Sequence, residues 1–147
     1  MRPNNPEPEL SQPKDEETLR LEKNGEVIFS SREHGIKPLV ECLAEFCGNI
    51  EDGILTDKVV GTAAARMIGA AGICVRVRTE LISISARRRL EKRGIGVEAR
   101  REAEFIRGKV NNSPCPMEAL SEKYTDDTSF FQAIFTFFSL PVPDGLK

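Results

Sequence analysis

The fold of this chain is decided by residues 54–78, which read ILTDKVVGTAAARMIGAAGICVRVR. Residues 54–60 are rich in β-branched side chains and predict a short strand. Residues 62–71 are mostly small and predict a helix that can approach its neighbours closely, with Gly72 at its end. Residues 73–78 alternate apolar and charged side chains, as expected of a second strand. A strand, a helix and a strand in succession indicate an α/β unit.

Upstream of this unit, Asn24-Gly25 separates two apolar runs and predicts a β-hairpin, because both residues of a type I′ turn need a positive φ. In that register Lys23 faces Glu26, and Leu21 faces Ile28. A helix then begins at Pro38 and ends at Gly48, as the helical spacing of its apolar residues indicates.

Downstream, we expect a helix over residues 83–93, a strand over 96–101, a helix from Pro116 to about Tyr124 and a final helix from about Thr128. The final helix holds five of the eight phenylalanines, so it belongs either to the core or to a subunit interface. The order of the elements predicts an α/β fold of three layers, α-β-α, around a mixed sheet that opens with an antiparallel β-hairpin.

Length and composition predict one soluble domain. The chain has 147 residues, 39% of them hydrophobic and 30% charged, which is typical of a single domain. Residues 1–17 hold four of the nine prolines, so we expect a disordered tail there, a single domain over 18–140 and a short tail over 141–147. Because no apolar run is long enough for a membrane span or a secretory signal, we expect a cytoplasmic protein with no membrane partner.

The formal net charge of -2 hides a basic centre. Residues 66–109 contain 12 Lys and Arg residues against five Asp and Glu residues. This segment is either a face for phosphate or nucleic acid, or a solvated surface that pairs with acidic parts of the same molecule. No aromatic residues are interleaved with its cluster Arg87-Arg88-Arg89 and Lys92-Arg93, so nucleic-acid binding is not expected.

The first candidate site is Asp57-Lys58-Val59-Val60-Gly61-Thr62, where a strand runs into a helix. Ligands of α/β sheets bind near the carboxyl ends of strands, and the N-terminus of a helix presents unpaired N–H groups to an anion. Lys58 would supply a positive charge and Thr62 a hydroxyl to a phosphate or a carboxylate. The alternative is that Thr62 only caps the helix.

The second candidate site is Cys115 with Glu118. Because Pro116 suits the first helical turn, Cys115 falls at the N-cap, where helix N–H groups lower the pKa of a thiol. Glu118 is placed to reach back as a proton acceptor, or to complete a capping box with no chemistry. The catalytic candidates are therefore Asp57, Lys58, Cys115 and Glu118, and the ligand-binding candidates are Gly61, Thr62, Asn111 and Asn112.

Between Leu21 and Ile134, four segments carry a resemblance to a known family. They are the hairpin 21–29, the helix start Gly35-Ile36-Lys37-Pro38-Leu39, Asp57-Lys58-Val59-Val60-Gly61 with Ala63-Ala64-Ala65, and Cys115-Pro116-Met117-Glu118. In these segments the chain resembles a prokaryotic family of unknown function, number 1893 among the domains of unknown function. The resemblance implies a cytidine-deaminase-like fold. Thr62 departs from the family pattern, which has a basic residue there.

Zinc chemistry does not follow from this resemblance. Zinc deaminases need a His or Cys ligand and a catalytic Glu at the start of one helix, and a PCxxC pair on the next. Here the helix start reads Gly61-Thr62-Ala63-Ala64, and Glu118 stands in place of the second cysteine after Cys115. The four cysteines form no CxxC pair and His34 is the single histidine, so we expect no metal and no cofactor.

Two functional hypotheses follow. In the first, the protein is an enzyme or a degenerate enzyme that binds or acts on a small molecule, nucleotide-like as the fold resemblance suggests, in a pocket of Asp57, Lys58, Cys115 and Glu118. In the second, it is a noncatalytic module for ligand sensing or for assembly into a homo-oligomer, through the same pocket or the phenylalanine helix. The sequence is compatible with both hypotheses and argues against a zinc-dependent deaminase.

Overall fold

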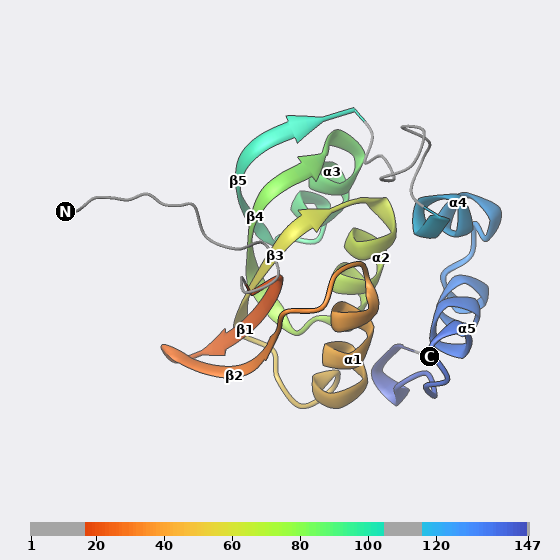
Figure 1. Cartoon of the computed structure of the whole chain (residues 1–147), viewed down its shortest axis with the longest axis horizontal. Helices are drawn as coiled ribbons and strands as arrows, with labels where there is room; N and C mark the ends of the chain where they lie inside the picture. Colours follow the sequence, from red (N-terminus) through yellow and green to blue (C-terminus); the bar gives the residue numbers. More distant parts are fainter. Residues whose placement is uncertain (1–16, 105–115, 147) are drawn as a thin grey trace.

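The computed structural model describes residues 17–104 and 116–146. A five-stranded sheet has the strand order β2-β1-β3-β4-β5 (Figure 1). Its strands are β1 (Leu19–Lys23), β2 (Glu26–Ser31), β3 (Gly53–Val60), β4 (Cys74–Ser83) and β5 (Gly96–Ala103). Strand β1 pairs antiparallel with β2 and β3, whereas β3, β4 and β5 are parallel. The α/β class, the mixed sheet and its antiparallel opening are therefore confirmed.

The helices lie to one side of the sheet (Figure 1). They are α1 (Lys37–Phe46), α2 (Thr62–Ala71), α3 (Ile84–Lys92), α4 (Pro116–Lys123), α5 (Asp127–Phe137) and the short 3-10 helix η2 (Asp144–Leu146). Helices α1, α2 and α3 each connect strands that run in the same direction, and each connection advances the same way across the sheet. Because such crossovers are right-handed, all three cover the same face.

Helices α4 and α5 pack on the outer side of that helical layer (Figure 1). The three-layer class fits, but both helical layers lie on the same face of the sheet, so the order is sheet, α1 to α3, then α4 and α5. On the opposite face of the sheet, Glu98 of β5 pairs with Arg76 and Arg78 of β4. Within residues 17–104 and 116–146, no helix covers this charged face.

The core lies between the sheet and the helices and continues into α5. Leu55 of β3 and Val77 of β4 are fully buried against the helical layer. Three phenylalanines of α5 belong to the same core: Phe130, Phe131 and Phe135. Phe137 is 67% exposed. Most aromatic side chains of the phenylalanine helix are thus buried in the core.

The hairpin turn forms as predicted, but the pairing beyond it shifts. Asn24 and Gly25 both have a positive φ, and Lys23 pairs with Glu26. A β-bulge between Leu21 and Glu22 then places Leu21 opposite Phe29. The predicted pairing of Leu21 with Ile28 is wrong, because a bulge adds one residue to one strand and offsets the register.

The structure describes only part of the two tails that the sequence predicts. Residues 1–16 of the predicted tail lie outside the described residues. At the other end, the predicted tail 141–147 includes η2, whose Leu146 is 5% exposed and contributes to the core. In the described ranges, no helix has the length and apolar character needed to cross a membrane.

Candidate functional site

The N-terminus of α2 holds the carboxylate of a residue from α4. Gly61 is the N-cap of α2 and has no side chain to accept a hydrogen bond. Instead, Glu118 Oε2 accepts from the backbone N–H of Thr62 at 3.0 Å, and Oε1 accepts from that of Ala63 at 2.9 Å. Unpaired N–H groups and the helix dipole favour an anion at this position. The helix start therefore is an oxyanion site that Glu118 fills.

Thr62 links α2 to the start of α3. It is the first residue of α2, so the expectation that it caps the helix is wrong. Its Oγ1 lies 2.8 Å from Oγ of Ser85 in the first turn of α3, and Ser83 caps α3 by accepting from the Ala86 N–H. The two helix starts thus meet beyond the paired carboxyl ends of β3 and β4. Ligands of α/β proteins bind at this edge of the sheet.

Glu118 joins the two segments that the sequence singled out. It lies 56 residues from Thr62 in the chain and directly contacts it. Both of its oxygens accept from α2, whereas the capping box predicted for its own helix involves Cys115, which lies outside the described residues. The other candidates of this segment, Asn111, Asn112 and Cys115, lie outside the described residues.

Asp57 is a partly buried carboxylic acid in the middle of β3. Burial raises the pKa of its carboxyl to about 7, although hydrogen bonds from the backbone N–H groups of Lys58 and Val59 oppose this shift. Burial, with smaller contributions that include the Asp57 charge, raises the pKa of the Cys42 thiol on α1 to about 12. Asp57 lies two residues after Leu55, which is buried against the helical layer, so its side chain points to the helix side of the sheet. Its pKa suits proton transfer near neutral pH.

Lys58 lies apart from Glu118. Successive residues of a strand point to opposite faces, so Lys58 points away from the helix side, toward the open face. It lines a groove of about 410 Å³ together with Arg20, Arg78 and Arg100. Neither Thr62 nor Glu118 lines this groove. Of the predicted pocket, the structure brings Glu118 to Thr62, while Asp57 and Lys58 line this separate groove together.

The described cysteines are poor nucleophiles. Burial raises the pKa of Cys74 to about 12, as it does for Cys42, and both thiols are buried. A thiol that stays protonated neither attacks nor binds metal readily. Among the residues that the structure describes, no three His, Cys, Asp or Glu side chains gather as a metal site would require.

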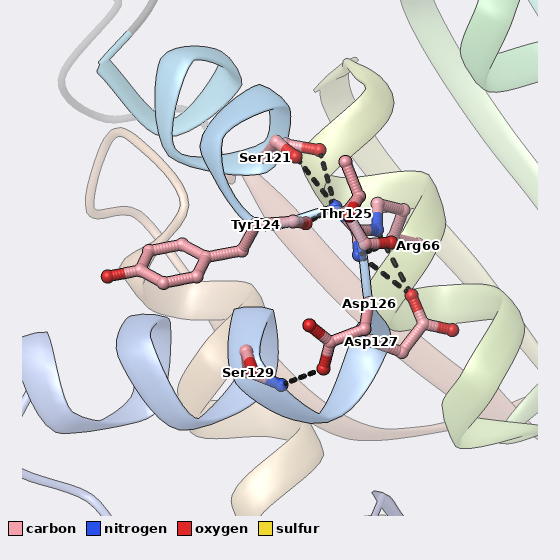
Figure 2. Close-up of polar contacts among 7 residues, drawn as sticks. All are labelled: Arg66, Ser121, Tyr124, Thr125, Asp126, Asp127 and Ser129. Carbon is pink, nitrogen blue, oxygen red and sulfur yellow. Dashed lines mark hydrogen bonds and ion pairs between the residues drawn. The ribbon is translucent and has the colours of Figure 1, made fainter.

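Arg66 is a buried arginine that sequence reasoning missed (Figure 2). Its guanidinium donates to the carbonyl oxygens of Ser121 and Tyr124, each at 2.8 Å, and to the carboxylate of Asp127 at 2.9 Å. It also lies 4.2 Å from the centre of the Phe130 ring. A buried cation needs such pairing to offset the loss of its hydration. Arg66 thereby fixes α4 and the start of α5 against α2.

This anchor positions the candidate site, because Glu118 lies on the same helix as Ser121, one turn away. The sequence did offer one indication of this role. Arg66 is the single charged residue in the otherwise uncharged segment Thr62-Ala63-Ala64-Ala65-Arg66-Met67-Ile68. A charge inside an otherwise apolar helix is expected to be paired when that helix is buried.

Comparison with known proteins identifies similar chains. The family model for TM1506, a domain of unknown function (DUF1893), matches residues 13–138. The chain is also similar to the crystal structure of a DUF1893 family protein (TM1506) from Thermotoga maritima, with 28% sequence identity and a TM-score of 0.73. That match covers 83% of this chain and 81% of the Thermotoga chain. No curated protein matches this chain.

Proposed function

This chain belongs to the DUF1893 family of domains of unknown function, and we propose that it binds a small, nucleotide-like molecule where α2 and α3 begin. We call this the edge site and define it by Gly61, Thr62, Ser85 and Glu118. The observation that carries the proposal is the contact of both Glu118 oxygens with the N–H groups of Thr62 and Ala63.

The Glu118 carboxylate is oriented for recognition. Each carboxylate oxygen has about two lone-pair positions, and each Glu118 oxygen uses one of them for a backbone N–H of α2. The remaining positions can accept hydrogen bonds from a ligand that carries N–H donors. The amino groups of nucleobases are such donors, and Glu is a known type of acceptor for them.

Two hydroxyl groups lie beside the carboxylate. Thr62 Oγ1 and Ser85 Oγ are 2.8 Å apart and hydrogen-bond to one another. A hydroxyl both donates and accepts, so this pair can serve a sugar hydroxyl or a ring nitrogen of the same ligand. The anion proposed from the sequence at the start of α2 is here the protein's own carboxylate, so recognition relies on ligand donors more than on ligand charge.

We also propose catalytic roles for Cys115 and Glu118 and ligand-binding roles for Asn111 and Asn112 at the edge site, and catalytic roles for Asp57 and Lys58 in the separate groove that both line. Asp57 lines the groove that contains Lys58 and is not part of the edge site, so its pKa of about 7 suits a general acid or base for a ligand that reaches that groove. If the protein is noncatalytic, the same edge site binds the ligand and no product forms.

Binding can be tested with cytidine, adenosine and their 5′-monophosphates as probes. Calorimetric titration of the wild type is compared with Glu118→Gln and with the control Glu122→Gln, which changes an exposed residue of the same helix. We expect saturable binding of at least one probe, at least tenfold weaker binding to Glu118→Gln and unchanged binding to Glu122→Gln. Absence of binding by every probe, or equal binding by Glu118→Gln, would overturn the proposal.

Chromatography of the probe after incubation separates the two hypotheses. Conversion of a bound probe supports the enzyme, and a bound probe that is recovered intact supports the noncatalytic module.

A further inference from the structure

A basic groove lies away from the edge site, on the outer surface of α2 and α3. It has a volume of about 620 Å³ and is bounded by the second half of α2, the second half of α3 and the first residue of α5. Five basic and two acidic side chains line it: Arg66, Arg88, Arg89, Lys92 and Arg93 against Glu91 and Asp127. We call it the α2–α3 groove.

Both acidic residues of this groove already have basic partners. Asp127 pairs with Arg66 at 2.9 Å, and Glu91 pairs with Arg87 at 3.1 Å. By contrast, Arg88, Arg89 and Lys92 are exposed and form no ion pair with any residue in the described ranges. The α2–α3 groove therefore has an excess of positive charge that the described part of the molecule does not balance.

Arg93 is held in place by a contact with Gly69 of α2. Arg93 Nη1 donates to the carbonyl oxygen of Gly69 at 3.2 Å. A Cβ atom at Gly69 would lie 3.3 Å from Arg93 Cγ, so the glycine leaves room for the arginine chain to cross the helix. A glycine inside a helix is less favourable than an alanine, and here it permits this close approach.

The helix dipole explains only part of this arrangement. Cations at the C-terminal end of a helix are stabilised by its dipole, which accounts for Arg89 and Lys92 in the last turn of α3 and for Arg93 at its C-cap. It does not account for Arg88, which lines the same groove, or for the mutual repulsion of the exposed Arg88, Arg89 and Lys92. A multivalent anion would remove that repulsion.

We propose that the α2–α3 groove binds a small molecule with two or more phosphate groups. Arginine suits this role because its planar guanidinium binds phosphate oxygens in pairs. Among the residues that the structure describes, no aromatic residue lines the groove, so these residues offer no stacking platform for the bases of a nucleic acid. This site is separate from the edge site and does not depend on the function proposed for it.

The probe for this proposal is inorganic tripolyphosphate, titrated calorimetrically into the full chain at low salt. The test variant is Arg88→Gln/Arg89→Gln. The control is Arg32→Gln/Arg101→Gln, which removes the same charge from two exposed residues. Neither residue lines the α2–α3 groove or the groove of about 410 Å³ that contains Lys58. We expect saturable binding by the wild type, at least tenfold weaker binding by the test variant and wild-type binding by the control.

Two further measurements separate this site from others. Glu118→Gln should bind tripolyphosphate as the wild type does, because the edge site is elsewhere. A single-stranded oligonucleotide should bind more weakly than tripolyphosphate. The proposal is overturned if the wild type does not bind tripolyphosphate, if the test variant binds as well as the wild type, if the control loses as much affinity, if Glu118→Gln abolishes binding, or if the oligonucleotide binds more tightly.

Discussion

Glu118 of α4 caps α2 at Thr62, which lies 56 residues earlier in the chain. The cap is a tertiary contact, because Gly61 at the N-cap position has no side chain that accepts a hydrogen bond. The start of α2 therefore depends on where α4 packs. The same carboxylate is the group on which the proposed ligand recognition rests.

Replacing Glu118 with alanine should lower the free energy of unfolding by about 1.5–3 kcal/mol, because two hydrogen bonds to a charged acceptor are lost at a helix start. Urea unfolding at neutral pH measures the change. Glu122→Ala on the exposed side of the same helix should stay within about 0.5 kcal/mol of the wild type. Equal effects of the two substitutions would show that the α2 cap contributes nothing specific.

Replacing Arg66 with methionine should destabilise the protein by about 2–4 kcal/mol. The substitution leaves the carbonyl oxygens of Ser121 and Tyr124 without their donor, and buried groups without partners are costly. Arg76→Met is the matched control, because Arg76 forms an exposed ion pair with Glu98 that is worth at most about 1 kcal/mol.

Hydrogen exchange gives a second measurement on Arg66→Met. Because Arg66 fixes α4 against α2, the amide of Thr62 should exchange faster in this variant, through loss of the Glu118 contact. Unchanged protection of Thr62 in a destabilised variant would contradict the link between the two contacts.

Stability should depend on pH through Asp57. Its carboxyl has a pKa of about 7 in the folded protein and about 3.9 when unfolded, so the folded state binds the proton more tightly. Its contribution therefore becomes less favourable as pH rises from about 4 to about 7, by up to about 4 kcal/mol. Asp57→Asn does not titrate, so it should gain stability relative to the wild type between pH 5 and pH 8. Urea unfolding at both pH values measures this gain, and a pH-independent difference would contradict it.

Local chemistry predicted much of the fold. The hairpin turn follows from the positive φ that Asn24 and Gly25 adopt easily, and the order of strands and helices follows from periodicity and glycine stops. The bulge at Leu21 did not follow, since a register shift depends on how both strands pack on the sheet.

The candidate site depends on contacts that spacing along the chain does not encode. The sequence singled out Thr62 and Glu118 separately, each as part of a local cap, and the structure joins them across two helices. Thr62 and Glu118 meet only because α4 packs against α2. Arg66 of α2 holds α4 there by donating to the carbonyl oxygens of Ser121 and Tyr124, more than 50 positions later in the chain. A helical pattern indicates which face of a helix is buried, but not which partner covers it.

The central claim is that a nucleotide-like molecule binds at Glu118 and the start of α2. The most direct measurement follows the backbone amide resonances of Thr62 and Ala63 by NMR during titration with cytidine, adenosine and their 5′-monophosphates. We expect both resonances to shift saturably in the wild type and in Glu122→Gln, and to stay in place in Glu118→Gln. Saturable binding that leaves both resonances unmoved in the wild type, or no saturable binding by any of the four probes, would contradict the claim.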